Sequence, residues 1–238
     1  MSRFQNPICL ALDSARRDEV TRLVELTREH VGVFKIGTTA LVGCGPDIVA
    51  EVASARPVFV DLKFHDIPAQ VEGAIESVRR LGAGYTTVHA SGGSDMIKAA
   101  VAAAGEELAV LGVTVLTSLE NTDLERLGIS GGVGAHVARL AEVALDAGVR
   151  GLVCSPKEVG LLRARFGSEP LLVVPGIRPV RPPSEAGDDQ RRTDSPSEAL
   201  AAGADLVVVG RPISAAPDVA AAARLLLEDL RRGSRGNQ

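Results

Sequence analysis

The segment Phe59–Pro68 brings ionisable side chains together at a spacing that could do chemistry. It reads Phe-Val-Asp-Leu-Lys-Phe-His-Asp-Ile-Pro, so Asp61 precedes Lys63 by two positions. If the segment is a β-strand, alternation directs both charged side chains to one face and Leu62 to the other. Charges that face a protein interior are costly to desolvate unless they pair with each other or serve a reaction. The spacing alone leaves two interpretations, a catalytic pair or an ion pair that plugs the mouth of a barrel.

Ionisable, hydrogen-bonding or glycine residues also follow the chain's other short apolar runs. In chain order they are Asp13, Lys35, His89, Thr117 with Ser118, Ser155, Gly176, and Gly210 with Arg211. Any one of them could be an ordinary strand-end residue that meets solvent. In the same way, Asp66 could be a solvated turn residue or a helix N-cap ahead of Pro68. With Asp61, Lys63 and Asp66, however, the set contains two lysines and three aspartates, which favours a common site.

The apolar runs alternate with amphipathic segments at intervals of about 30 residues, as in repeated β-α units. The runs that we predict as strands are Ile8–Leu12, Val33–Ile36, Val58–Leu62, Tyr85–His89, Leu108–Leu116, Gly151–Cys154, Leu171–Val174 and Leu206–Val209. The predicted helices are Asp18–Val31, Pro46–Ala55, Pro68–Leu81, Asp95–Ala104, Ala135–Ala147, Pro156–Phe166, Ser197–Ala202 and Asp218–Arg232. A polar tail, Gly233–Gln238, follows the last helix and is expected to be disordered.

Runs that are apolar on both faces are typical of a buried parallel sheet, whose strands need helical crossovers. Eight such units in 238 residues match the size of a (β/α)8 barrel. The alternative is an open doubly wound sheet, which would bring a glycine-rich turn after its first strand. Here that turn reads Asp-Ser-Ala-Arg at positions 13–16, without glycine. We therefore predict one α/β domain over residues 1–238, a single (β/α)8 TIM barrel with its site at the strand ends.

The composition argues against several classes of protein. A formal net charge of −4 and a pI of about 5.6 do not suit a protein that neutralises nucleic-acid phosphates. Aromatic residues make up only 3% of the chain, too few for base-stacking platforms. No apolar run approaches the roughly 18 residues of a membrane span, and the N-terminal one is too short for a secretory signal. The cysteines, Cys9, Cys44 and Cys154, are odd in number and widely spaced, so we expect reduced thiols and a cytoplasmic protein.

Several motifs occur in the order found in one enzyme family. The segment DLKFHDIP at 61–68 follows Leu-Asp at 12–13 and Phe-Lys-Ile-Gly at 34–37, and it precedes His-Ala-Ser-Gly-Gly at 89–93. Val-Leu-Thr-Ser at 115–118, Pro-Gly-Ile-Arg-Pro at 175–179, Gly-Asp-Asp-Gln-Arg-Arg at 187–192 and Val-Gly-Arg-Pro-Ile at 209–213 come later. From about Pro7 to about Leu230 the chain resembles the compact bacterial orotidine 5′-phosphate decarboxylases. Related barrels share the D-x-K-x-x-D element, so the combination of motifs carries the resemblance.

The resemblance implies a catalytic array of alternating charge, formed by Lys35, Asp61, Lys63 and Asp66, without cofactor or metal. Asp66 would project into the site of a neighbouring subunit, so the active form would be a homodimer with shared active sites. Conversion of orotidine 5′-phosphate to UMP in pyrimidine synthesis leaves a carbanion at C6 of the base. The Lys63 ammonium would stabilise and then protonate that carbanion, with Asp61 beside the departing carboxylate.

The resemblance also implies roles in substrate binding. Lys35 and Asp66 would hold the ribose hydroxyls, Asp13 would also bind the ribose, and Thr117 with Ser118 would face the base. Ile67, which follows Asp66 in the sequence, is also expected to contact the substrate.

Two further segments suit a phosphate group. Gly210 and Arg211 end the eighth predicted strand, where barrel enzymes often hold phosphate against backbone N–H groups and a helix start. The segment at about 176–195 is charged and longer than typical barrel loops. It is either a mobile surface loop or a lid that closes on phosphate through Gln190, with Arg178 at its root.

Two other interpretations stay open. A Mg²⁺-dependent sugar-phosphate decarboxylase or synthase on a related barrel would share Asp61 and Lys63. It would need an acidic ligand near the second strand end, where this chain has Lys35. A non-catalytic nucleotide-binding barrel would use its Asp–Lys pairs only to hold subunits together. His89 ends the fourth predicted strand and is either a ligand contact or an ordinary strand-end residue. His65 is expected to pack in its loop. No histidine forms a convincing metal cluster with the carboxylates.

Overall fold

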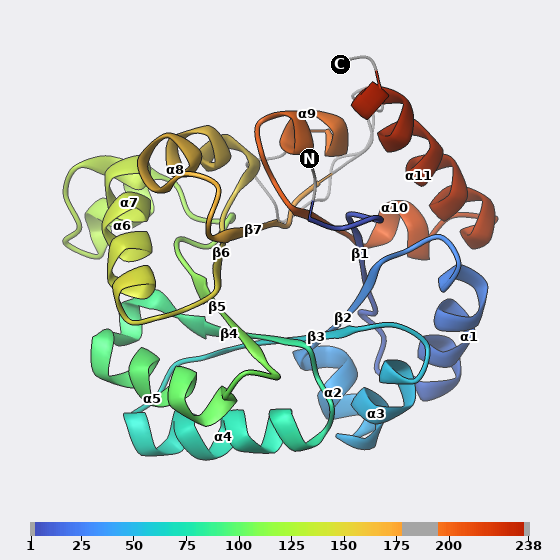
Figure 1. Cartoon of the computed structure of the whole chain (residues 1–238), viewed down its shortest axis with the longest axis horizontal. Helices are drawn as coiled ribbons and strands as arrows, with labels where there is room; N and C mark the ends of the chain where they lie inside the picture. The colour runs from blue at the N-terminus through green and yellow to red at the C-terminus, as the bar shows by residue number, and fades with distance from the viewer. Residues whose placement is uncertain (1–2, 178–194, 236–238) are drawn as a thin grey trace.

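Residues 3–177 and 195–235 are described by the computed structural model of the chain. Eight parallel strands follow one another around a closed barrel, and the first strand pairs with both the second and the eighth (Figure 1). The helices surround the strands as an outer ring. The predicted (β/α)8 barrel is confirmed.

The strands are β1 (Ile8–Ala11), β2 (Val33–Gly37), β3 (Val58–Phe64), β4 (Tyr85–His89), β5 (Ala109–Val113), β6 (Gly151–Val153), β7 (Leu171–Val174) and β8 (Leu206–Val209). The α-helices are α1 (Arg17–Thr27), α2 (Thr38–Cys44), α3 (Asp47–Ala53), α4 (Pro68–Arg80), α5 (Ser94–Ala104), α6 (Asn121–Arg126), α7 (Gly132–Asp146), α8 (Val159–Phe166), α9 (Pro196–Ala201), α10 (Arg211–Ser214) and α11 (Val219–Arg235). Two short 3-10 helices, η1 (Ala90–Gly92) and η2 (Pro156–Glu158), follow β4 and β6.

Alternation along the strands divides the core into two parts. One part lies between the strands and the helices and forms the larger apolar cluster. The other part lies on the barrel axis and consists of Cys9, Ala11, Val33, Phe59, Leu111, Val113, Val153, Val173, Leu206 and Val208. On the first three strands the axial positions continue to Asp13, Lys35 and Asp61. The charged residues therefore lie directly above an apolar plug.

The amino end of the barrel is held by a buried ion pair. Arg163 of α8 donates to the carbonyls of Gly203 and Pro170, both at 2.8 Å, and contacts Asp205 Oδ2 at 2.6 Å. Asp205 Oδ2 also accepts the N–H of Leu172 at 2.8 Å. Because these charges bind backbone groups of the strand starts, this end serves stability and leaves the carboxyl end for a site. No helix within the described ranges is long and apolar enough to cross a membrane.

Several predicted boundaries are wrong. The run Leu108–Leu116 was predicted as one strand, but β5 ends at Val113, where its pairing with β6 ends. The short helices α2 and α6 were not predicted, because six or seven residues carry little periodicity. Helix α11 extends to Arg235, three residues past its predicted end at Arg232, and the expected disorder of the tail stays a prediction. Residues 236–238 of the expected tail lie outside the described residues.

Candidate active site

A cavity of about 570 Å³ opens at the carboxyl ends of the strands, a volume typical of small-molecule sites. Its lining includes residues proposed from the sequence, namely Asp13, Lys35, Asp61, Lys63, Thr117, Gly210 and Arg211. Its other lining residues are Ala11, Phe59, Val113, Val115, Leu116, Val153, Cys154, Pro175, Gly176, Ile177, Val208 and Pro212. The cavity is thus apolar over much of its wall, and four of its five charged lining residues are gathered on one side.

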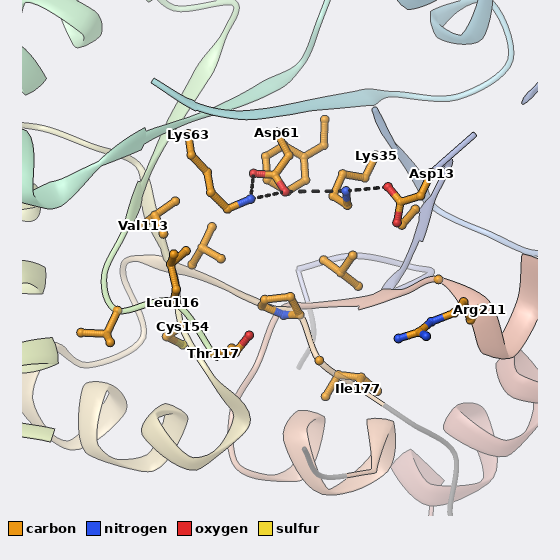
Figure 2. A pocket seen from close by; sticks show the side chains of 18 of the residues that line it. Asp13, Lys35, Asp61, Lys63, Val113, Leu116, Thr117, Cys154, Ile177 and Arg211 are labelled. Atoms are coloured by element: carbon orange, nitrogen blue, oxygen red, sulfur yellow. Dashed lines mark hydrogen bonds and ion pairs between the residues drawn. The ribbon is translucent and has the colours of Figure 1, made fainter. Parts of the chain in front are cut away.

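Four charged side chains form a row along that side, in the order Lys63, Asp61, Lys35 and Asp13 (Figure 2). Lys63 Nζ lies 2.9 Å from both carboxylate oxygens of Asp61. Lys35 Nζ lies 3.7 Å from Asp61 Oδ2 and 3.4 Å from Asp13 Oδ1. The charges alternate in sign and sum to zero. Each ammonium therefore has a carboxylate partner, which favours the ionised forms in a site of low dielectric.

Asp61 and Lys35 are the buried centre of the row, each with 12% of its side chain exposed. Burial raises the pKa of Asp61, but the Lys35 and Lys63 ammoniums and the hydrogen bonds to its oxygens outweigh burial, so its pKa is lowered. Burial likewise acts to lower the pKa of Lys35. The carboxylates of Asp61 and Asp13 outweigh it, so the pKa of Lys35 is raised. Both central groups are therefore charged at neutral pH.

The end of β3 is distorted where it carries Lys63. The register with β4 shifts between Val60 and Phe64, which makes a bulge in β3. Lys63 has φ of 52° and is the one non-glycine residue with positive φ in the ranges 3–177 and 195–235. Such a conformation costs about 1–3 kcal/mol and persists where the surroundings impose it, often at functional sites. In spite of the bulge, Lys63 and Asp61 meet on the axial face, as alternation predicted.

Two residues that shape the row were not singled out from the sequence. Thr87 of β4 donates to Asp61 Oδ1 at 3.0 Å and accepts the N–H of Lys63 at 2.8 Å. Gly37 follows Lys35 on the axial face of β2, and a Cβ at this position would lie only 3.2 Å from Lys35 Nζ. Alternation along β4 and β2 predicts that both lie on the axial face, but it does not predict that they contact the charged row.

The other end of the cavity is formed after β8. Arg211 begins α10, and in Figure 2 it lies beyond Asp13, at the opposite end from Lys63. A Cβ at Gly210 would lie 3.8 Å from Asp13 Oδ2, an ordinary contact, so glycine is not required here by the neighbouring residues. Its missing side chain instead leaves the rim open. A guanidinium beside an open backbone after the eighth strand suits an oxyanion such as phosphate.

The remaining predicted residues are not in the lining of the cavity. Asp66, Ile67 and Ser118 are exposed, and 64% of Ile67 is accessible to solvent. Asp66 Oδ1 accepts the N–H of Ile67 at 2.7 Å, which orients the carboxylate at the rim. The fold therefore does not bring these three residues into the cavity of their own subunit. Arg178 and Gln190 lie outside the described residues.

Histidines and cysteines near the site offer weaker chemistry. The rings of His65 and His89 stack with centroids 5.4 Å apart, and burial, His65 and Lys63 lower the pKa of His89. Burial raises the pKa of the Cys9 thiol to about 12, which makes it inert as a nucleophile. Within the part of the chain that the structure describes, no three His, Cys, Asp or Glu residues could hold a metal ion together.

Comparisons with known proteins agree with this geometry. Residues 6–226 match the family model described as "Orotidine 5′-phosphate decarboxylase / HUMPS family". A protein of Anaeromyxobacter sp. (strain K) named orotidine 5′-phosphate decarboxylase is 48% identical over 224 residues, which cover 94% of this chain and 97% of that protein. A protein of Thermobifida fusca with the same name is 45% identical over 228 residues, covering 95% and 96%.

A solved structure supports the same comparison. The crystal structure of orotidine 5′-phosphate decarboxylase from Lactobacillus acidophilus has a TM-score of 0.82 to this chain at 32% identity. The match covers 95% of this chain and 99% of that one. The family match, from residue 6 to residue 226, includes all eight strands and every described residue of the charged row.

Proposed function

The chain belongs to the orotidine 5′-phosphate decarboxylase / HUMPS family, and we propose that it decarboxylates orotidine 5′-phosphate to UMP in pyrimidine synthesis. The names of relatives at 45% and 48% identity support this reaction. The observation that carries it is the row of alternating charge in the cavity wall, whose centre is buried and in which Lys63 lies 2.9 Å from Asp61. Taking such charges out of water is costly even when they pair, and a role in catalysis accounts for that cost.

The reaction explains why an ammonium and a carboxylate are needed side by side. The bond between C6 and the carboxylate breaks, CO2 leaves, and the electron pair stays on C6 as a carbanion. The Lys63 ammonium stabilises that charge as it develops and then transfers a proton from Nζ to C6. Asp61 lies beside the departing carboxylate, where like charge favours its loss, and it holds the Lys63 ammonium in place.

The layout of the cavity supports one orientation of the nucleotide. Lys63 at one end of the row would meet C6 of the base, and Asp13 with Lys35 would bind the ribose hydroxyls. Arg211, at the other end, would bind the phosphate. Thr117 lines the same cavity, and we expect it to hydrogen-bond the base. The roles expected for Arg178 and Gln190 at the phosphate stay predictions.

We propose that the reaction uses no metal and no organic cofactor. An enzyme that holds Mg²⁺ on a related barrel needs oxygen ligands near the end of the second strand. Here that position is Lys35, whose ammonium lies 3.7 Å from Asp61 Oδ2 and 3.4 Å from Asp13 Oδ1. The ammonium occupies the place between the two carboxylates that a divalent cation would take, and it repels such a cation.

We further propose that two copies of the chain form a homodimer with shared active sites. Asp66 and Ile67 follow β3 at the rim of the barrel, and both are exposed in the single chain. A large apolar side chain exposed beside a carboxylate suits the edge of an interface. In the dimer, Asp66 would complete the alternating array in the partner's cavity.

Shared sites predict recovery of activity in mixed dimers. Asp66→Asn and Lys63→Ala should each be nearly inactive alone, but a heterodimer of the two has one site with both Lys63 and Asp66 intact. Random mixing should restore about a quarter of wild-type activity, because half of the dimers are mixed and each has one intact site of two. Heterodimers purified from differently tagged chains should have about half of the wild-type activity per dimer, because each has one intact site of two. Inactive heterodimers would contradict the sharing of sites.

The ionisation of the row predicts the pH dependence of kcat/KM. Because its pKa is lowered, the Asp61 carboxyl stays ionised to a lower pH than an ordinary carboxyl. Its protonation should therefore remove activity only below about pH 4. The substrate phosphate titrates near about pH 6, so kcat/KM should be divided by the UMP association constant in the same buffers. The quotient should be level from about pH 5 to about pH 7. An acid limb within that interval would contradict the ionised Asp61.

We also propose that the enzyme works in the cytoplasm. Cys9, Cys44 and Cys154 are free thiols, as in proteins of a reducing compartment. Substrate and product are soluble nucleotides, so the proposal includes no nucleic-acid or membrane partner.

The proposed activity is tested by incubating the purified protein with orotidine 5′-phosphate. We expect the orotate absorbance to disappear at the rate at which UMP appears, with one CO2 released per UMP. A folded protein that binds UMP but produces none would instead support the nucleotide-binding barrel and overturn the proposal.

A further inference from the structure

Thr87 contacts two residues of the charged row, Asp61 and Lys63, but does not itself line the cavity. It is the middle residue of β4, fully buried, and its hydroxyl points toward the bulged end of β3. The hydroxyl uses both of its hydrogen-bonding capacities there. It donates to Asp61 Oδ1 at 3.0 Å and accepts the backbone N–H of Lys63 at 2.8 Å. The Thr87 side chain thus holds both the carboxylate of Asp61 and the backbone of Lys63, the two residues proposed to act on the substrate.

The pairing of β3 with β4 explains why a hydroxyl is needed at this position. Val60 pairs with Thr86 and Phe64 pairs with Val88, so three residues of β3 lie opposite Thr87 alone. A bulge of this size leaves backbone groups of β3 without their ladder partners. The Thr87 hydroxyl takes the place of a ladder acceptor for Lys63, the residue with φ of 52°.

We propose that Thr87 is a positioning residue for the decarboxylation. Thr87 fixes the left-handed backbone of Lys63 and thereby the direction from which the Lys63 ammonium approaches C6. It also fixes the orientation of the Asp61 carboxylate. This inference rests on the proposed function. It adds a residue of β4 to the array, one that touches neither the substrate nor the cavity.

Loss of the hydroxyl should act on turnover more than on binding. In Thr87→Val the shape of the side chain is nearly kept, but the Lys63 N–H loses its acceptor and Asp61 loses a donor. Because hydrogen bonds to charged or buried groups are among the stronger ones, we expect kcat to fall roughly 10- to 100-fold. The dissociation constant of UMP should change by less than about threefold, because phosphate and ribose contacts remain.

Thr86 supplies a matched control on the same strand. It is equally buried, and its hydroxyl donates to the carbonyl of Val60 on β3 at 3.0 Å, but it faces the helices. Thr86→Val therefore removes a comparable hydrogen bond between the same two strands without touching the charged row. Thr87→Ser keeps the hydroxyl and should retain kcat within about fivefold of wild type. If Thr87→Val does not fold, Thr87→Ala carries the same comparison without a bulky substitute.

The experiment compares kcat, KM and UMP binding for wild type, Thr87→Val, Thr87→Ser and Thr86→Val. The proposal predicts a loss of kcat in Thr87→Val alone, with recovery in Thr87→Ser. It is overturned if Thr87→Val keeps kcat within threefold of wild type, or if Thr86→Val loses as much.

A second readout separates this inference from the proposed activity. The pKa of the Asp61 carboxyl, measured by carbon-13 NMR in the free protein, should be higher in Thr87→Val than in Thr86→Val, because one of its hydrogen bonds is lost. This difference is measurable even if wild type shows no turnover of orotidine 5′-phosphate, an outcome that would reject the activity alone. Equal pKa values in the two variants would reject the role of Thr87.

Discussion

Replacement of Lys63 by alanine should lower kcat by at least about 10⁴-fold, because it removes both the proton donor and the charge that stabilises the C6 carbanion. The UMP dissociation constant should rise by less than about tenfold, because Asp13 and Arg211, the proposed ribose and phosphate contacts, lie away from Lys63 in the cavity. Turnover of orotidine 5′-phosphate and calorimetric binding of UMP measure the two quantities on the same preparation.

Lys98→Ala is the matched control for this variant. Lys98 is an exposed lysine of α5 and is not part of the cavity lining. Its replacement removes the same side chain and charge from the surface, and kcat should stay within about twofold of wild type. A Lys63→Ala protein that turns over as fast as Lys98→Ala would show that the row only holds the barrel mouth together.

Replacement of Asp61 by asparagine should lower kcat by about 10²- to 10³-fold, although the two side chains have nearly the same shape. The carboxylate lies 2.9 Å from Lys63 Nζ and 3.7 Å from Lys35 Nζ. Without its charge the two ammoniums face each other across a neutral amide, so Lys63 loses the contact that orients it. The like charge beside the departing carboxylate is lost as well. Steady-state kinetics over a range of substrate concentrations separates kcat from KM.

Asp13→Asn tests whether the position of the charge matters. Asp13 also contacts Lys35, at 3.4 Å, but 60% of its side chain is exposed and it lies at the ribose end of the row. Its replacement should raise KM more than it lowers kcat, because in the proposed orientation it would contact the nucleotide away from the reacting carbon. Equal losses of kcat in Asp13→Asn and Asp61→Asn would contradict the separate roles assigned to the two carboxylates.

The charged row is largely predictable from the sequence because it depends on strand parity. Asp61 and Lys63 share a face of one strand, and Lys35 shares the axial parity of a neighbouring strand, so a closed parallel barrel brings them together. The alternation rule needs no knowledge of side-chain packing. For this reason the fold class is confirmed, and seven of the predicted site residues line the cavity, whereas Asp66, Ile67 and Ser118 do not.

The bulge at Lys63 and the role of Thr87 are not predictable in the same way. Both depend on how β3 pairs with β4, and the register shift between Val60 and Phe64 leaves no mark in the residue pattern. The overlong fifth strand has a related cause. Val115 and Leu116 are apolar because they line the cavity, and composition does not distinguish an apolar strand from an apolar cavity wall. The contact proposed for Asp66 is with a second copy of the chain, and the pattern of one chain does not show such an interface.

The most direct test of the central claim is the initial rate of UMP formation from orotidine 5′-phosphate in excess EDTA. The claim is that charged side chains of the protein suffice for this decarboxylation. It predicts rapid UMP formation at a rate that neither EDTA nor added Mg²⁺ changes. Loss of activity in EDTA with recovery on Mg²⁺ addition would contradict it and would favour a metal-dependent enzyme of a related barrel.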